Sequence, residues 1–448
     1  MIRNKPTAEP RRGERLSLVA FLNGVRVGDI YQTSSGTLRF VYKDQWRDNS
    51  GAYPLSLSMP LTAVEHGDEA ISPFLWGLLP DSDRTLDHYG RLFGVSARNP
   101  VALLSHMGAD CAGAVQFAPP ERADVLEGPA PNAPTVEWLT HAEIARELKT
   151  VREQGIPGTT RRTVGQFSLA GAQPKIALLE EKERWGRPTG RTPTNRILKP
   201  PSEEFRGFAE NEHLCLGLAS SLGLAAVRSR VMRFEDEVAI VVERFDRAKR
   251  GRVYYRIHQE DICQALGVMP TRKYENEGGP GVKDTITLLR DASRNPQEDV
   301  QRFLGATILT WVIAGTDAHA KNYALLHSPA GIRLAPFYDI VSYLPYADPG
   351  LHRVKLAMKI GGTYIVRRIN RISWETLAKD NVIPVEYILD NVAQVLQQLP
   401  SALEAVTERA TKEGLDTTII DPLAARILQR ATECAGMLVT NPAVSTAV

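Results

Sequence analysis

The first part of the chain alternates apolar and polar residues, as a half-buried β-sheet does. Residues 15–30 alternate around Asn23-Gly24, the dipeptide that most favours a two-residue hairpin turn. Ser35-Gly36 predicts a second turn before the apolar run at 38–42. The pattern therefore predicts a small antiparallel meander near the N-terminus.

A helical pattern follows the predicted meander. Between residues 74 and 94, apolar side chains recur every three or four positions, which is the spacing of an amphipathic helix. Pro80-Asp81-Ser82 interrupts this pattern and predicts a turn, with Ser82 or Asp83 capping the second helix. Together with the meander, these helices predict an α+β module over residues 15–117.

The stretch 118–135 contains five prolines and few large apolar side chains, which is typical of a linker. The amphipathic segment 136–155 ends in glycine and predicts a helix, and residues 155–163 predict a flexible basic loop. Residues 1–14 are polar, lack the apolar core of a signal peptide, and predict a mobile basic tail.

The remainder of the chain changes from strand-like to helical. Four stretches favour strands, namely 166–179, 196–200, 227–234 and 236–245, with a helix expected at 208–223. Helices are expected from there on at 259–267, 285–292, 300–315, 385–399 and 422–439. The expected organisation is a strand-rich lobe over 136–258 and a helical lobe over 259–448, an α+β fold with two lobes like that of a kinase.

Composition excludes several classes of protein. The 448 residues are 43% apolar, and 54 Lys and Arg against 52 Asp and Glu give a net charge of +2, so a chain-wide nucleic-acid surface has no support. The apolar run at 303–315 is too short to cross a bilayer. The four cysteines form no CxxC pair, which favours structural thiols in a reducing cytoplasm. We therefore expect a cytoplasmic protein without a membrane segment.

The strongest chemical motif is GTDAHAKN, residues 315–322. The common nucleotide, zinc and hydrolase signatures are absent from the sequence, but Asp317 and Asn322 have the spacing of the base and the metal-holding Asn in a kinase catalytic loop. Asp339, in the strand-like stretch LAPFYDIVS, lies at a suitable distance downstream to supply a second metal ligand. Carboxylate and amide oxygens are ligands that Mg²⁺ accepts.

Two upstream features suit a nucleotide. Lys199 lies in an apolar strand candidate, and a buried lysine needs a partner, for which Glu210 and Glu212 on the next helix are both open. The stretch SLAGAQPK, residues 168–175, offers small residues whose backbone N–H groups could approach phosphates.

Each of these residues also has a purely structural interpretation. Asp317 could cap a turn, Lys199 could be a surface lysine that buries only its stem, and His319 could simply hydrogen-bond within its loop. The GGPG run at 278–281 would ordinarily be only a flexible turn. Their order along the chain, from small-residue loop to strand Lys, helix Glu, Asp-x4-Asn and a further Asp, favours a kinase.

These motifs together resemble the HipA family of bacterial serine/threonine kinases, the toxin halves of HipBA toxin–antitoxin modules. The similarity covers nearly the whole chain apart from the N-terminal tail. It is carried by LLPDS, GADCAGAV, SLAGAQPKIALL, ILKP, NEHLCLGLASSLGL, VVERFDR, QEDICQALG, KYENEGGPG, GTDAHAKN and LAPFYDI.

The resemblance implies a two-lobed fold related to the phosphoinositide kinases, with ATP and Mg²⁺ as cofactors. Asp317 would be the catalytic base, with His319 beside it in the catalytic loop, and Asn322 and Asp339 would hold Mg²⁺. Lys199 would bind phosphate. The remaining nucleotide contacts would come from the hinge residues Glu243 and Phe245 and from the phosphate loop, Gly171, Ala172, Gln173 and Lys175.

The resemblance also implies regulation and partners. Ser168 matches the family's autophosphorylation serine, whose modification expels the phosphate loop, and Pro174 should stiffen that loop. The implied substrate is an aminoacyl-tRNA synthetase, glutamyl-tRNA synthetase in the family's best-known case, with growth arrest or persistence as the result. A HipB-like helix-turn-helix antitoxin would neutralise the kinase and provide most of the contact with operator DNA.

Two other functions remain open. One is a non-enzymatic co-repressor that only holds an antitoxin on DNA, although an intact set of catalytic residues argues against it. The other is a small-molecule kinase, which would leave the LLPDS and GADCAGAV blocks unexplained.

Overall fold

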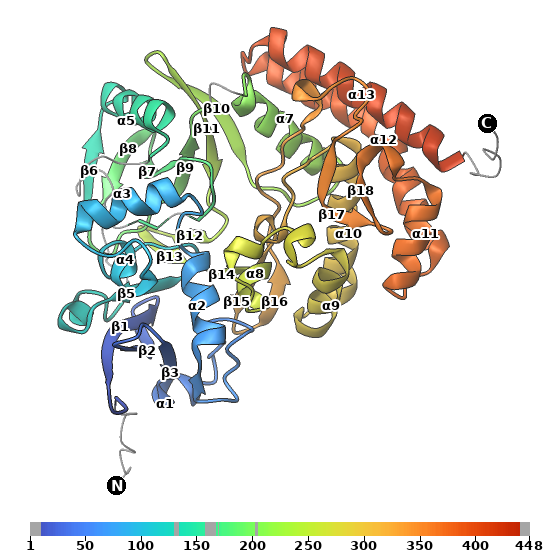
Figure 1. Ribbon diagram of the computed structural model, residues 1–448. Helices are drawn as coiled ribbons and strands as arrows, with labels where there is room; N and C mark the ends of the chain where they lie inside the picture. The colour runs from blue at the N-terminus through green and yellow to red at the C-terminus, as the bar shows by residue number, and fades with distance from the viewer. Residues whose placement is uncertain (1–9, 130–133, 157–166, 169, 202–204, 440–448) are drawn as a thin grey trace. The chain divides into compact units, whose positions relative to one another are not determined.

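The computed structural model describes residues 10–129, 134–156, 167–168, 170–201 and 205–439 (Figure 1). The chain forms two compact units that are interleaved along the sequence. The first unit comprises residues 1–200, 232–271 and 324–335, and the second comprises 201–231, 272–323 and 336–448, so the backbone passes between them five times. The expected continuous lobes over 136–258 and 259–448 divide the chain differently.

The N-terminal part of the first unit contains the expected meander within a five-stranded antiparallel sheet, in the order β4-β3-β2-β1-β5. Its strands are β1 (Glu14–Leu22), β2 (Val25–Thr33), β3 (Leu38–Tyr42), β4 (Glu65–His66) and β5 (Val115–Ala118). Asn23 and Gly24 have φ of +49° and +84°, as the two-residue hairpin turn requires. The predicted hairpin is confirmed. Glu14 already lies in β1, and residues 1–9 of the expected tail fall outside the described residues.

Four helices accompany this sheet, namely α1 (Asp44–Arg47), α2 (Asp68–Gly77), α3 (Asp83–Phe93) and α4 (Pro100–Met107). The predicted break at Pro80–Ser82 is confirmed, and the Ser82 hydroxyl accepts a hydrogen bond from the Thr85 N–H at 3.3 Å to cap α3. Phe40 and Phe74 are fully buried in the shared core between strands and helices. The predicted α+β module is therefore present.

The proline-rich stretch is partly folded onto this module. A 3-10 helix, η1 (Pro120–Val125), follows β5, and Leu126 is buried against Val19 and Phe21 of β1. The Gly128 N–H also donates to the Gly24 carbonyl at 2.9 Å. The first half of the expected linker is thus packed structure, because Leu126 gives it an apolar anchor.

The second sheet of the first unit has six strands in the order β10-β11-β9-β7-β8-β6. They are β6 (Val136–Leu139), β7 (Ile176–Glu181), β8 (Arg184–Pro188), β9 (Arg196–Lys199), β10 (Ser229–Phe234) and β11 (Glu237–Glu243). The helix α5 (His141–Gln154) packs Ile144 and Leu148 against this sheet. The helix expected from residue 136 begins only at 141, since Thr140 caps it and the four residues before that cap pair with β8.

Smaller sheets complete the first unit. β12 (Arg247–Arg250) pairs with β13 (Val253–Arg256), and β14 (His258–Asp261) pairs with β15 (Ala324–Ser328), which pairs in turn with β16 (Gly331–Leu334). The helix expected over 259–267 is wrong in its first half: only the short α8 (Ile262–Ala265) is helical. β14 is a strand because β15, more than 60 residues later, supplies its hydrogen bonds.

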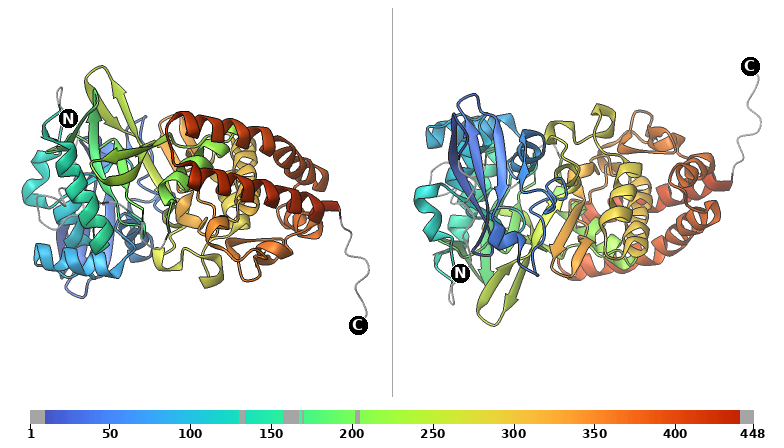
Figure 2. Two further views of the ribbon diagram at one scale, coloured as in Figure 1. Left: turned by 90° about the horizontal axis from the view of Figure 1, so that it is seen from above. Right: turned by 90° about the horizontal axis from the view of Figure 1, so that it is seen from below.

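The second unit is mostly helical, as expected for the C-terminal part of the chain. It contains α7 (Phe208–Ser221), α9 (Val282–Ala292), α10 (Pro296–Val312), α11 (Arg371–Asp380), α12 (Val385–Lys412) and α13 (Thr417–Val439), with the hairpin β17 (Lys355–Ile360) and β18 (Thr363–Ile365). The long helices α12 and α13 run side by side (Figures 1 and 2). Trp311 of α10 packs edge-on against Trp374 of α11 in the core.

None of the helices described here combines the length and apolar character needed to cross a membrane. All four cysteines are buried with free thiols, as expected. Burial raises the pKa of the Cys215 thiol to about 12, so this thiol stays protonated near neutral pH.

Candidate active site

The predicted catalytic loop follows α10 directly in the second unit. The His319 N–H donates to the Asp317 carbonyl and the Asn322 N–H donates to the His319 carbonyl, both at 2.9 Å, so the loop is tightly wound. Its winding exposes 72% of the Asp317 side chain and buries all but 8% of Asn322. The loop therefore presents a carboxylate outward and holds an amide inward.

The Asn322 side chain has the property expected of a metal ligand. Its Oδ1 atom is buried and has no hydrogen-bond partner among the described residues. A buried polar atom without a partner is costly unless something else satisfies it. An amide oxygen in this state fits a hard cation such as Mg²⁺.

Asp339, the second predicted metal ligand, has a strained backbone. Its φ is +54°, in the left-handed region that few residues with a side chain occupy, Asn and Asp being the commonest among them. The sequence predicted a strand here, but the residue lies in irregular backbone beyond the bridge residue Phe337. Such strain is retained where surrounding contacts enforce it, often at functional sites.

The segment around Asp339 is held close to the catalytic loop. The Tyr338 hydroxyl, from the residue before Asp339, donates to the carbonyl of Lys321, the residue before Asn322, at 2.7 Å. The Ser342 hydroxyl donates to the Ile313 carbonyl at 2.8 Å, where the chain leaves α10. The structure therefore brings the two predicted metal ligands onto neighbouring, mutually bonded segments of one unit.

Asn211 of α7, which the sequence analysis missed, is bonded to the segment that carries Asp339. It is 1% exposed, its Nδ2 donates to the Ser342 carbonyl at 2.8 Å, and its Oδ1 accepts from the Ser342 N–H at 3.0 Å. These two bonds fix the end of the segment that carries Asp339. Its neighbours Glu210 and Glu212, the two partners predicted for Lys199, differ in burial: Glu212 is fully buried and Glu210 is partly exposed.

The predicted phosphate-binding lysines lie in the first unit. Lys199 ends β9 opposite Ile240 of β11, and Ile176 of β7 is opposite Leu198. Extending this antiparallel register by one residue places Lys175 opposite Lys199. The two cations therefore belong to the same end of the sheet, and both are at least nine-tenths buried.

The predicted phosphate loop closes on itself beside these lysines. The Lys175 ammonium donates to the Ala170 carbonyl at 2.8 Å. Gly171 has φ of +100°, and a Cβ there would lie 2.8 Å from the Lys175 Nζ. The positive φ favours glycine at 171, and a side chain there would also displace the Lys175 ammonium from its present position. Ala172, Gln173 and Pro174 complete the turn before β7.

Ser168 is completely buried at the start of this loop. Its hydroxyl donates to the Leu78 carbonyl at 2.6 Å, and its N–H donates to the Asp110 carbonyl at 3.2 Å. Nearby, the Asp81 N–H donates to the Gly171 carbonyl at 3.2 Å. The LLPDS block thus holds the phosphate loop through the Leu78 carbonyl and the Asp81 N–H, which gives that N-terminal motif a physical role.

The predicted hinge lies at the end of β11. Glu243 is opposite Arg196 at the other end of β9 from Lys199, three residues or about 10 Å away along the strand. Phe245 follows in a partly buried turn. The hinge and Lys199 therefore lie at opposite ends of the β9–β11 pair. This separation would suit a ligand with an aromatic group at one end and phosphates at the other.

A buried ionic cluster fixes this hinge. Asp110, from the GADCAGAV block, accepts hydrogen bonds from Arg247 at 2.8 Å and Arg256 at 3.0 Å, while Asp246 accepts from Arg244 at 2.8 Å. Burial alone would raise the pKa of Asp110, but the Arg247, Arg256 and Arg244 guanidiniums hold it far below its ordinary value. We call these five residues the Asp110 cluster. The GADCAGAV and VVERFDR motifs contain four of the five residues, but nothing in the sequence indicated that the two motifs pair with each other.

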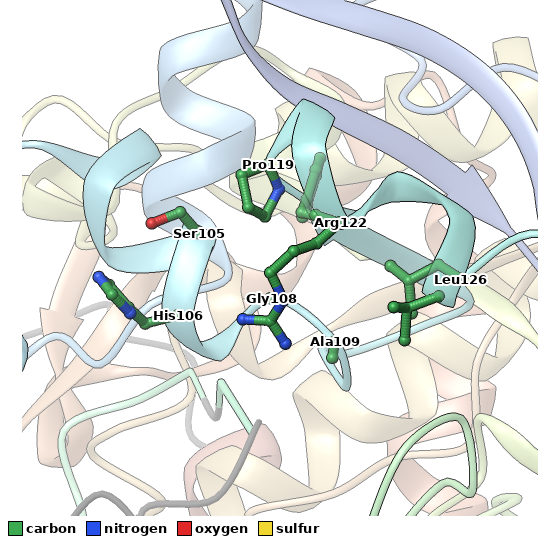
Figure 3. Close-up of a pocket in the computed structure, with 10 residues that line it drawn as sticks. Ser105, His106, Gly108, Ala109, Pro119, Arg122 and Leu126 are labelled. Carbon is green, nitrogen blue, oxygen red and sulfur yellow. The ribbon is translucent and has the colours of Figure 1, made fainter.

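A pocket elsewhere in the first unit contains none of the predicted site residues. It lies between α4 and η1, with the Arg122 side chain between His106 and Leu126 (Figure 3). His106 is already stacked on Phe93, with ring centroids 4.7 Å apart. The candidate chemistry therefore stays with the loops described above.

Comparison with known proteins identifies both parts of the chain. A model of the HipA N-terminal domain matches residues 18–118, and a model of the HipA-like C-terminal domain matches residues 167–403. The second match alone covers more than half of the chain and includes the phosphate loop, β9, the catalytic loop and Asp339.

Individual relatives agree with these matches. The Y4mE protein of Sinorhizobium fredii (strain NBRC 101917 / NGR234), named as a candidate kinase, is 34% identical over 410 residues, which is 91% of this chain and 96% of its own length. The serine/threonine-protein kinase toxin HipA of Shewanella oneidensis is 28% identical over 87% of this chain and 89% of its own.

A solved structure has the same fold. A chain in the complex of HipA, HipB and operator DNA from Shewanella oneidensis MR-1 aligns with a TM-score of 0.80 and 24% identity, over 94% of this chain and 98% of that one. The α+β, two-lobed kinase-like fold expected from the sequence is thereby confirmed.

Proposed function

The chain belongs to the HipA family, and on that premise we propose that it is an ATP-dependent serine/threonine kinase that acts as a toxin. The observation that carries the proposal is the pairing, in one unit, of an exposed carboxylate with a buried, unsatisfied amide oxygen. Asp317 offers the base and Asn322 the metal ligand that phosphoryl transfer requires.

In this proposal, Asp317 accepts the proton of a serine or threonine hydroxyl while the oxygen of that hydroxyl bonds to the γ-phosphorus of ATP. The bond from that phosphorus to the bridging oxygen breaks, and ADP leaves with the electron pair. Asn322 and Asp339 would hold Mg²⁺, which neutralises phosphate charge when bound. The strained backbone of Asp339 and its tie to Lys321 through Tyr338 support a fixed ligand position.

The first unit would bind the rest of the nucleotide. Lys199 and Lys175 would attract phosphate oxygens, and the backbone N–H groups of Gly171 to Gln173 would approach them. Glu243 and Phe245 would meet adenine as the hinge. The shared level of the two lysines and the opposite location of Glu243 on the same sheet support this division of labour.

We also propose that self-phosphorylation of Ser168 silences the kinase. The serine is fully buried and its hydroxyl donates to the Leu78 carbonyl, so a dianionic phosphate has no space at that position. Modification would therefore require release of the loop from LLPDS, and the modified loop could not return.

The proposed partners follow from the family and its solved complex. That complex contains HipA, HipB and operator DNA. For this chain we propose a HipB-like antitoxin that supplies most of the DNA contact, in keeping with the net charge of +2. We propose an aminoacyl-tRNA synthetase as substrate, inhibition of translation as the effect, and the cytoplasm as the location.

The test is phosphate transfer from radiolabelled ATP by the purified full-length chain with Mg²⁺. Wild type should label itself at Ser168 and label one member of a panel of purified aminoacyl-tRNA synthetases. Asp317→Asn should lose both activities, and Ser168→Ala should lose only self-labelling while its activity on the synthetase persists longer. Nucleotide binding by wild type without any transfer would refute kinase activity and favour a co-repressor.

A further inference from the structure

The segment KYENEGGPG, residues 273–281, contains none of the residues assigned to the proposed reaction. Its GGPG run suggested only a flexible turn. In the structure it lies between the 3-10 turn η2 (Pro270–Arg272) and α9, and it includes η3 (Glu275–Glu277). It touches the catalytic loop through Lys273, whose carbonyl accepts from the Ala320 N–H at 3.3 Å.

The turn is closed rather than flexible. The N–H groups of Glu277 and Gly279 both donate to the Tyr274 carbonyl at 3.0 Å. A Cβ on Gly279 would lie 1.9 Å from the Arg272 carbonyl oxygen and 2.8 Å from that of Tyr274, so glycine is needed for the chain to pass this closely. The turn thus folds back on the backbone of Tyr274 and fixes it.

Glu275 anchors the same turn to β17. Its carboxylate accepts from the Lys359 N–H at 2.6 Å and lies 3.1 Å from the Lys359 ammonium. The hydrogen bond to Glu275 raises the pKa of Lys359, as expected for a cation that gains an anionic partner. A Cβ on Gly281 would meet this carboxylate at 2.5 Å, so the last glycine leaves room for the anchor.

The result of this construction is the location of the Tyr274 ring. Its hydroxyl donates to the Asp317 Oδ1 at 2.6 Å, a short bond of the kind that a neutral donor makes to a carboxylate. The His319 ring packs edge-on against Tyr274, with centroids 5.0 Å apart and planes at 80°. Tyr274 is therefore held from the turn on one side and from the catalytic loop on the other.

This bond changes what Asp317 can do. Its side chain is 72% exposed, and an exposed carboxylate samples several rotamers in solvent. With Oδ1 held by Tyr274, the carboxylate plane is fixed and Oδ2 is the oxygen left for an incoming hydroxyl. Misplacement of a reacting group by about 1 Å can cost roughly 100-fold in rate.

We propose that Tyr274 is a positioning residue for phosphoryl transfer: it holds Asp317 so that Oδ2 meets the hydroxyl of the protein acceptor. The inference rests on the proposed role of Asp317 as the base. Lys273 and the glycines then serve to build a rigid support for one phenolic hydroxyl.

The experiment measures the initial rate of self-phosphorylation against ATP concentration for the full-length chain. Tyr274→Phe keeps the ring against His319 and removes only the hydroxyl. We expect its maximal rate to fall about 10- to 100-fold, while half-saturating ATP, the dissociation constant of ADP and the thermal midpoint stay at wild-type values. Tyr387→Phe, on the exposed face of α12, is the matched control and should behave as wild type.

Asp317→Asn separates this inference from the proposed function. If Asp317→Asn is inactive and Tyr274→Phe keeps a maximal rate within twofold of wild type, the positioning role is wrong and the kinase assignment stands. If Asp317→Asn keeps the wild-type rate, the base assignment fails and this inference fails with it. A Tyr274→Phe chain that loses nucleotide affinity or thermal midpoint in parallel with rate would show a merely structural role.

Discussion

The Asp110 cluster allows a quantitative prediction about stability. Asp110→Asn keeps the size and shape of the side chain but removes its charge. Three guanidiniums and two carboxylates leave the cluster with one net positive charge, and the substitution raises this to two among side chains that are at most 6% exposed. Uncompensated charge in such a place is strongly unfavourable.

The new amide also cannot satisfy its neighbours. Oδ1 of Asp110 accepts from Arg247 and Arg256, and Oδ2 accepts from the N–H and the hydroxyl of Thr194 at 3.1 and 2.8 Å. Whichever way the substituted side chain turned, its NH₂ group would face hydrogen-bond donors. Breaking one member of a buried ion pair costs about 3–5 kcal/mol. For a unit of this size we expect the thermal midpoint to fall by roughly 6–20 °C.

The assay is thermal unfolding of the full-length chain followed by near-ultraviolet circular dichroism. Asp83→Asn is the control, since it removes a carboxylate whose partner Arg98 is exposed, and its midpoint should not change. Arg247→Gln in the Asp110→Asn background restores the net charge and should recover part of the loss. A fall of less than 2 °C for Asp110→Asn would refute the reasoning.

Two further predictions concern His258 and Gly279. Burial, with His327 nearby, lowers the pKa of His258 to about 3. When the pH falls from 7.5 to 5, the unfolded chain therefore takes up a proton at this residue and the folded chain does not. The free energy of unfolding should fall by about 2 kcal/mol over this range. Urea unfolding at the two pH values measures this change in the free energy of unfolding, which should be smaller in His258→Gln. An equal change in the wild-type and His258→Gln chains would contradict the prediction. Gly279→Ala should lower the phosphorylation rate about 10-fold or more by displacing Tyr274. Gly436→Ala in α13, where a Cβ meets open space, should leave the rate unchanged, and a wild-type rate for Gly279→Ala would disprove the close approach.

Features set by neighbours in sequence were predictable. Asn23-Gly24 predicted the hairpin because the left-handed conformation of these two residues is a preference of the residues themselves. The Ser82 cap of α3 was predictable for the same reason, since its partner lies three residues away. The Asp317 and Asn322 pair was recognisable from its spacing alone. The structure adds the burial of Asn322 and the exposure of Asp317, while their roles in catalysis remain predictions.

Features set by distant partners were not predictable. β14 has helix-compatible spacing and becomes a strand only because β15 pairs with it. Asp110 lies in a loop, and the two arginines that bond to it, Arg247 and Arg256, are more than 130 residues away in the sequence. Tyr274 carried no chemical signal, since its function depends on one hydrogen bond across more than 40 residues. Tertiary contact, rather than local preference, decides these cases.

The five passages of the backbone between the two units constrain how such a protein can be divided. No single cut yields one complete unit, because residues 232–271 and 324–335 of the first unit are each flanked by segments of the second. A chain truncated before Ala324 would lose β15 and β16 and would leave β14 without the strand that pairs with it. Neither unit corresponds to one continuous segment of the chain, so recombination at one breakpoint cannot exchange either of them for that of a relative.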